Sequence, residues 1–116
     1  MRSNSGDGRP ALIDILHNIY LARKFIAGLD YSKFLASDMA FYAVIRCLEI
    51  ISEASRRLPA DMKARHPDIP WTAMAGAGNV YRHEYEDVQQ ALVWGVVQDR
   101  LPALLAAVEN ELELLL

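Results

Sequence analysis

The residues best equipped for chemistry follow one another in a short stretch in the second half of the chain. They are an amide, a guanidinium, an imidazole and a phenol: Asn79, Arg82, His83 and Tyr85. In a helix, Asn79 lies one turn before His83, and Gly78 lies one turn before Arg82, so these residues form one patch. Arginine binds phosphate through paired hydrogen bonds, and histidine transfers protons near neutral pH. The patch would suit phosphodiester chemistry. From the residue types alone, however, the favoured interpretation is an exposed Arg–His pair beside tyrosines that pack inward.

The other reactive side chains do not combine into a recognisable metal or nucleophile site. Asp14 and His17 have the i, i+3 spacing of two metal ligands on a helix. A di-metal helical bundle, however, needs paired Glu-x-x-His motifs, and the sequence contains none. Cys47 falls among apolar residues, which is typical of a thiol that only packs, and His66 precedes a proline, as loop residues often do. We therefore expect neither a metal ion nor a cofactor.

The charges are distributed unevenly along the chain. The sequence carries 12 Lys and Arg against 15 Asp and Glu, and its pI is near 5.5, which excludes a generally basic nucleic-acid binder. Residues 54–83, however, hold five of the Lys and Arg residues, two acids and two histidines. This segment is either a solvated surface or a confined site for an anion such as a substrate phosphate.

Hydrophobic periodicity predicts helices along almost the whole chain. Apolar residues recur at helical spacing, and glycine and proline punctuate the pattern. The expected helices start near residues 10, 38, 71, 88 and 102. Gly28 is a natural end for the first helix, and Pro59 follows the expected end of the second. No strand pattern or internal repeat competes, so we expect an all-α bundle of four or five helices.

A chain of 116 residues suits one domain, which we place at 10–116 after a polar, flexible segment at 1–9. No apolar run approaches the about 18 residues of a membrane span; the longest, Leu101 to Val108, contains Pro102. No apolar signal-peptide core follows the N-terminus, and a single cysteine excludes an internal disulfide framework. We therefore expect a cytoplasmic protein that does not enter a membrane.

The last five residues include four leucines. A cluster of this kind at a chain end is too apolar to remain fully in water. The leucines either pack back onto the bundle or cover a subunit interface. The second alternative implies a homodimer.

Several short segments, in the order found in one family, resemble the HepT-like branch of the HEPN superfamily, small all-helical bacterial toxins that are RNA nucleases. The matching segments are residues 12–15, 51–54, 67–71, 76–79, 83–85, 93–94 and 101–104. The combination is specific, although each segment alone would be weak. The resemblance implies a HEPN-type bundle, and a homodimer in which two motif helices meet around a cleft.

In this family the signature reads Arg-Asn-x-x-x-His-x-Tyr on the third helix. By resemblance, Asn79 matches the family's Asn, His83 its catalytic His, and Tyr85 its Tyr. The Arg position is occupied by Gly78, which is a departure from the family pattern. Long helical side chains lean toward the helix N-terminus, so Arg82 is expected to reach over the space at Gly78 and to compensate for the missing arginine.

The resemblance also implies a mechanism without a metal ion. The ribose 2′-hydroxyl attacks the adjacent phosphate, His83 moves protons, and an arginine stabilises the developing charge. Glu53 matches a polar family position near the motif and is expected to orient Arg82 or His83. DNA lacks the 2′-hydroxyl and would not be cut.

The family resemblance implies a biological role as the toxin of a toxin–antitoxin pair. The implied partner is a nucleotidyltransferase antitoxin that silences the toxin by adding AMP units to Tyr85. Because Gly78 replaces the family's arginine, two alternatives remain. One is a catalytically impaired HEPN domain that binds a nucleotide or the nucleotidyltransferase, and the other is a purely structural helical dimer.

Overall fold

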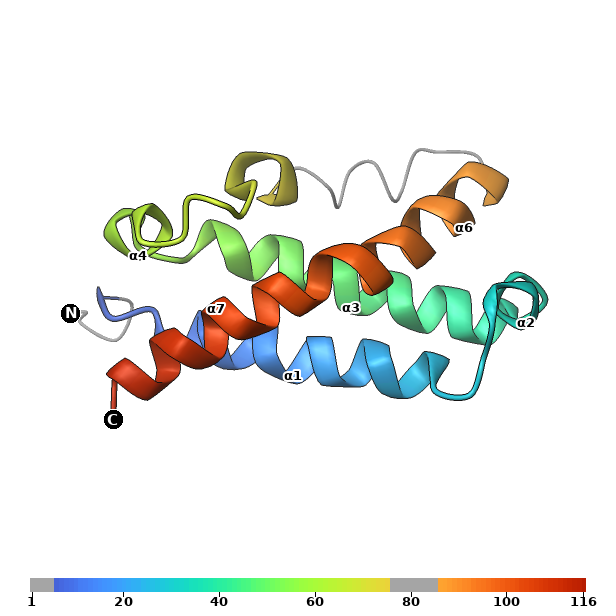
Figure 1. Ribbon diagram of the computed structural model, residues 1–116, viewed down its shortest axis with the longest axis horizontal. Coiled ribbons are helices and arrows are strands. Elements are labelled where there is room, and N and C mark those ends of the chain that lie inside the picture. Colours follow the sequence, from blue (N-terminus) through green and yellow to red (C-terminus); the bar gives the residue numbers. More distant parts are fainter. Residues whose placement is uncertain (1–5, 76–85) are drawn as a thin grey trace.

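The computed structural model describes residues 6–75 and 86–116, and most of this part of the chain is helical. Two long antiparallel helices, α1 and α3, pack side by side, and the C-terminal helical run lies across them (Figure 1). The elements are α1 Arg9–Ile26, α2 Tyr31–Leu35, α3 Asp38–Arg56, α4 Ala60–Ala64, α6 Glu86–Gly95, the π-helical turn η2 Val96–Arg100 and α7 Leu101–Leu114. Residues 71–75 are helical as well. No strand occurs within these described ranges, which confirms the all-α class.

The ends of the two long helices follow from local chemistry. Pro10 occupies the first turn of α1, where its missing amide hydrogen costs nothing. Gly28, just beyond the end of α1, has a φ of +81°, a conformation that glycine adopts without strain. The Ser37 hydroxyl accepts a hydrogen bond from the backbone N–H of Ala40 at 3.1 Å and so caps the start of α3. The first two expected helices are therefore confirmed.

The C-terminal half differs from the expected break before Pro102. The chain passes from α6 to α7 through η2 without leaving the helix. A proline ring clashes with the carbonyl four residues earlier in an α-helix, and the wider π turn relieves that clash. Consequently Gln90–Leu114 forms one helix long and apolar enough to cross a membrane, by length and composition alone. This corrects the expectation that no such segment exists, although a core helix has the same composition.

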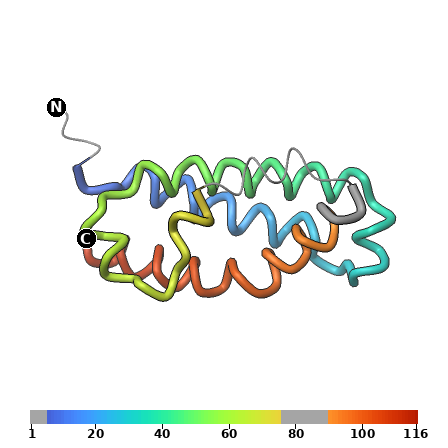
Figure 2. Tube along the Cα trace, turned by 90° about the horizontal axis from the view of Figure 1, so that it is seen from above, coloured from blue at the N-terminus to red at the C-terminus, as the bar shows by residue number. Residues whose placement is uncertain are grey.

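The core of the bundle lies between α1, α3 and the C-terminal run. Helix α1 contacts both α3 and α7, and Figure 2 shows it between them. The largest fully buried side chains are Phe34, Phe41, Leu12, Ile15, Ile19, Leu104, Val44, Val93 and Val108. Cys47 belongs to this core, and its burial raises the pKa of the thiol. Cys47 is therefore a packing residue, as expected.

The C-terminal leucines divide between the two expected roles. Leu112 and Leu115 pack against the core, whereas the side chain of Leu114 is 66% exposed and Leu116 is fully exposed. Packing back onto the bundle therefore explains only part of the cluster. The homodimer stays a prediction.

Candidate functional site

The signature residues Asn79, Arg82, His83 and Tyr85, and Gly78 with them, lie outside the described residues. The structure describes the elements that lead into the signature and out of it. Residues 71–75 end three positions before Gly78, and α6 begins directly after Tyr85. Among the described elements, α3 contacts the turn at 71–75.

Helix α3 holds the last described residue before the signature. The Ser52 hydroxyl donates a hydrogen bond to the carbonyl oxygen of Ala75 at 2.9 Å. Arg56 donates from Nη1 to the same oxygen. Ser52 is almost completely buried, with 2% of its surface exposed. Because Ser52 and Arg56 are four residues apart, they lie on the same face of α3, and this face meets residues 71–75.

Trp71 fixes the start of the same helical turn. Its indole Nε1 donates to the carbonyl oxygens of Lys63 and His66, at 3.0 and 3.1 Å. The turn continues with a hydrogen bond from the backbone N–H of Met74 to the carbonyl of Pro70 at 2.9 Å. The connection after α4 and the helical turn at 71–75 therefore form one hydrogen-bonded unit.

This unit is attached to α7 by a buried carboxylate. Glu111 is 3% exposed and accepts hydrogen bonds from Arg65 Nε at 3.1 Å and Arg65 Nη2 at 2.7 Å. His66 Nε2 donates to the same carboxylate at 2.7 Å. The hydrogen bonds from Arg65 lower the pKa of Glu111; burial acts in the opposite direction, and His66 adds to the lowering.

The Glu111 cluster was not predicted from the sequence, which indicated a plain loop residue at His66. The available signal was the position of Glu111 on the apolar face of α7, three residues after the buried Val108. A carboxylate there needs a cationic partner. The sequence does not identify that partner, because Arg65 and His66 lie 46 and 45 positions away from Glu111.

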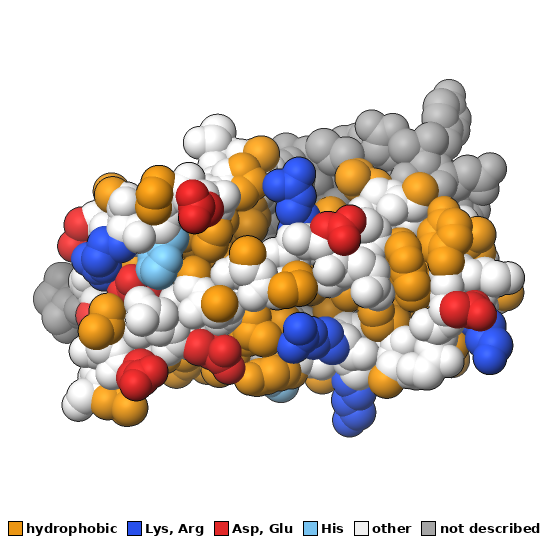
Figure 3. All heavy atoms as spheres, viewed as in Figure 1, with side chains coloured by type: hydrophobic (Ala, Val, Ile, Leu, Met, Phe, Trp, Pro, Cys, Tyr) orange, Lys and Arg blue, Asp and Glu red, His pale blue; other side chains and the backbone are white. Residues whose placement is uncertain are grey.

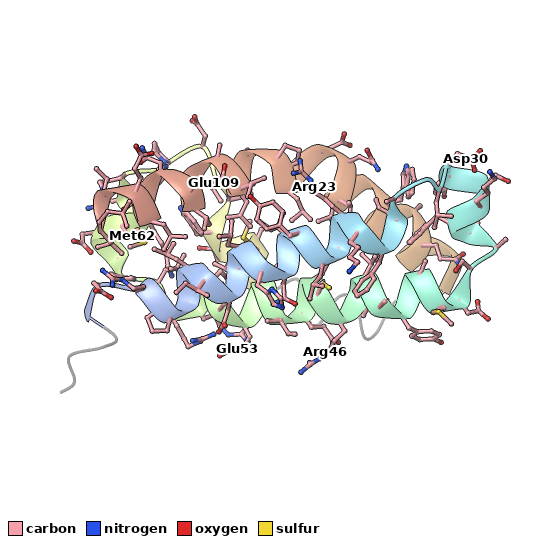
Figure 4. All side chains as sticks on the ribbon, turned by 90° about the horizontal axis from the view of Figure 1, so that it is seen from below. Arg23, Asp30, Arg46, Glu53, Met62 and Glu109 are labelled. Carbon is pink, nitrogen blue, oxygen red and sulfur yellow. The ribbon has the colours of Figure 1, made fainter. Side chains whose placement is uncertain are left out.

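Glu53 lies on a different face of α3 from Ser52, because successive helical residues point about 100° apart. Its carboxylate forms an ion pair with Arg57 Nε at 3.2 Å, and Arg57 Nη2 pairs with Asp14 at 2.9 Å. Figure 4 shows Glu53 and Arg46 pointing away from α7. The role of Glu53 in orienting Arg82 or His83 stays a prediction.

Asp14 and His17, which have the i, i+3 spacing of metal ligands, belong to no metal-binding group within the described residues. Asp14 is engaged by Arg57, and His17 is exposed on α1. Among residues 6–75 and 86–116, no three His, Cys, Asp or Glu side chains are grouped so that they could hold a metal ion.

A cavity of about 500 Å³ borders the same face of α3. Its described walls come from α3, residues 68–74 and the run from α6 to α7, and most of them are apolar. The polar and charged members are Ser52, Asp68, Asp99 and Arg100. Figure 3 shows apolar side chains at the surface of this side of the molecule, between separated charged groups. Ser52 thus contributes both to the cavity and to the contact with Ala75.

Comparison with known proteins identifies the family. Residues 15–111 match the family described as Ribonuclease HepT-like. The chain belongs to the HepT-like ribonuclease family. The matched range contains Glu53 and all four signature residues, and membership supports a ribonuclease function with RNA as the substrate.

Individual relatives of this HepT-like chain agree with the family match. A proposed RNase of Methanocaldococcus jannaschii is 37% identical over 103 residues, which cover 89% of this chain and 94% of the relative. The protein named "Probable ribonuclease HepT" from Thermococcus cleftensis is 39% identical over 93 residues, covering 80% of this chain and 84% of the relative. No solved structure shows a significant match to the chain.

Proposed function

We propose that this HepT-like protein is an RNA endonuclease that works without a metal ion. The observation that carries the proposal is the family match over residues 15–111, a range in which Asn79, His83 and Tyr85 have the spacing of the family signature. Gly78 occupies the signature's arginine position, and Arg82 precedes His83. The hydrogen bonds of Ser52 and Arg56 to the carbonyl oxygen of Ala75 are consistent with it, because they hold the chain three residues before Gly78.

In the proposed reaction the ribose 2′-oxygen forms a bond to the adjacent phosphorus, and the bond from phosphorus to the 5′-oxygen breaks. His83 takes the proton of the 2′-hydroxyl or gives one to the leaving 5′-oxygen, and solvent water completes the other proton transfer. Arg82 stabilises the charge on the phosphate oxygens, in the place that the family gives to an arginine at position 78. Asn79 contacts the same phosphate. The products are a 2′,3′-cyclic phosphate and a free 5′-hydroxyl.

The proposed biological role is that of a cytoplasmic toxin held in check by a nucleotidyltransferase antitoxin. In this proposal the antitoxin adds AMP units to Tyr85, and the toxin is a homodimer. Tyr85 is two residues beyond His83 in the sequence. A modified Tyr85 would carry negative charge beside the groups that bind the RNA backbone.

The test is a cleavage assay with one oligonucleotide made as RNA and as DNA, in the presence of a chelator. We expect RNA cleavage that the chelator does not abolish, fragments ending in a 2′,3′-cyclic phosphate, and intact DNA. Cleavage of DNA, or complete loss of activity in chelator that returns with a divalent metal, would contradict the proposal.

A second candidate function is favoured by Gly78, which replaces the signature arginine. In that case the domain has lost cleavage and binds an adenine nucleotide or its nucleotidyltransferase partner; a purely structural dimer would bind neither. Calorimetric titration with an adenine nucleotide distinguishes a nucleotide-binding domain from a purely structural dimer. RNA cleavage by the wild-type protein would exclude both the impaired binding domain and the purely structural dimer.

A further inference from the structure

The carbonyl oxygen of Ala75, three residues before Gly78, accepts hydrogen bonds from two side chains of α3. A carbonyl oxygen has two lone pairs, and the oxygen of Ala75 accepts one hydrogen bond from Ser52 and one from Arg56. Ser52 is buried, so its hydroxyl has a fixed place in the bundle. A buried hydroxyl and a guanidinium on one helix face thus hold a single point of the chain.

The start of the same turn, at Trp71, is held by the connection after α4, which is bonded to α7. Trp71 is bonded to the backbone of Lys63 and His66, and His66 is bonded to the buried Glu111 of α7. The short helical turn at 71–75 is therefore fixed at its start by the α7 side of the fold and at its end by α3. This arrangement leaves little freedom in where residue 75 lies.

We propose that Ser52 and Arg56 are positioning residues for RNA cleavage, because they fix the carbonyl of Ala75 and so fix where the signature begins. This inference rests on the proposed ribonuclease function. Asn79 follows Ala75 by only four residues, a span of at most about 14 Å even for an extended chain. We expect a shift at Ala75 to displace the signature residues as well, and a misplacement of about 1 Å can cost about 100-fold in rate.

Positioning predicts a different kinetic change from direct RNA binding by Arg56. A residue that only places catalytic groups changes kcat and leaves KM for RNA unchanged. A cation that contacts the RNA backbone changes KM and makes binding less sensitive to salt. The two roles are therefore separable in one set of measurements.

The experiment compares Ser52→Ala and Arg56→Met with matched controls on the same helix. Ser55→Ala removes a hydroxyl that is equally buried but donates to the carbonyl of Ser52 within α3. Arg46→Met removes an exposed guanidinium that pairs with Glu49. We expect a fall in kcat of about 10–100-fold for the two test variants, with an unchanged KM, and near wild-type kcat for the controls. Arg56→Lys keeps one donor and should recover most of the activity.

A second measurement does not depend on cleavage. Hydrogen–deuterium exchange of the peptide containing residues 71–75 should be faster in Ser52→Ala and Arg56→Met than in wild type and both controls. Unchanged kcat and unchanged exchange would overturn the proposal, and so would a raised KM with reduced salt dependence in Arg56→Met. If wild type leaves RNA intact, the ribonuclease function and the catalytic part of this inference both fail. The exchange result still decides whether α3 holds this turn.

Discussion

At the scale of single residues, the ribonuclease proposal depends on the source of positive charge at the scissile phosphate. The family signature places an arginine where this chain has Gly78, and Arg82 lies four residues further along the sequence. Arg57 and Arg65 are not substitutes, because both are engaged by carboxylates in the described structure. Arg82, which directly precedes His83 in the sequence, is the expected source of the charge.

The first prediction tests that compensation. Arg82→Ala should lower kcat by about 100–1,000-fold, the usual cost of removing one group that stabilises transition-state charge. Adding Gly78→Arg to that variant should restore a large part of the activity, since it returns the guanidinium to the family position. Steady-state rates on one RNA substrate measure both effects. Wild-type rates in Arg82→Ala alone would show that the charge comes from elsewhere.

At the scale of elements, the link between α7 and the connection after α4 is electrostatic. Glu111 has a pKa below its ordinary value of 4.5, chiefly because Arg65 donates hydrogen bonds to the carboxylate. A carboxyl whose pKa is lower in the folded state stabilises the fold at pH values above its unfolded pKa. That contribution is lost as the pH falls through the folded-state pKa.

The second prediction follows from this sign. Glu111→Gln should lower the free energy of unfolding by about 1–2 kcal/mol near neutral pH, because a charged acceptor of several hydrogen bonds is lost. The difference from wild type should begin to shrink as the pH falls below 4.5, where the unfolded carboxyl is protonated, and it should be lost below the lower folded-state pKa, where the carboxyl is protonated in both states. Urea unfolding over a pH series measures this difference in the free energy of unfolding, with Glu113→Gln, at an exposed glutamate, as the control. A deficit that stays constant down to strongly acidic pH would contradict the assignment.

The sequence predicted those elements whose signals are local. The cap at Ser37, the proline in the first turn of α1 and Gly28 beyond its end each act within a few residues, so the two long helices were predicted nearly to their ends. The short helices α2 and α4 and the π turn before Pro102 were not predicted. Each of these elements has five residues, which is too short for hydrophobic periodicity to reveal, although α2 has a local cap in the Asp30 carboxylate, which accepts from Lys33 N–H at 2.8 Å.

The same distinction applies to the candidate site. The types and spacing of the signature residues are visible in the sequence, and they led to the correct family. The anchor at Ala75 was not predicted, because it joins residues 19 and 23 positions apart through side-chain contacts. Glu53 was selected by resemblance, whereas Ser52, its neighbour in the sequence, is the residue that contacts the segment before the signature.

At the scale of the whole molecule, the third prediction concerns the partner. Co-expression with a nucleotidyltransferase encoded beside this protein should add AMP units to Tyr85, because the phenol is close in sequence to the groups proposed to bind RNA. Intact-mass spectrometry should show the added mass in wild type and its loss in Tyr85→Phe. Tyr31→Phe, an exposed tyrosine on α2, is the control and should remain modified. An unmodified protein in a stable complex with the nucleotidyltransferase would contradict the prediction and would show that inhibition occurs by binding alone.

The measurement that tests the central claim most directly is the rate of RNA cleavage by His83→Ala relative to wild type. His17→Ala, at an exposed histidine of α1, is the matched control. Loss of a general acid or base typically costs about 100–10,000-fold in rate. The proposed mechanism predicts a loss of this size for folded His83→Ala and none for His17→Ala. Equal cleavage by wild type and His83→Ala would contradict it.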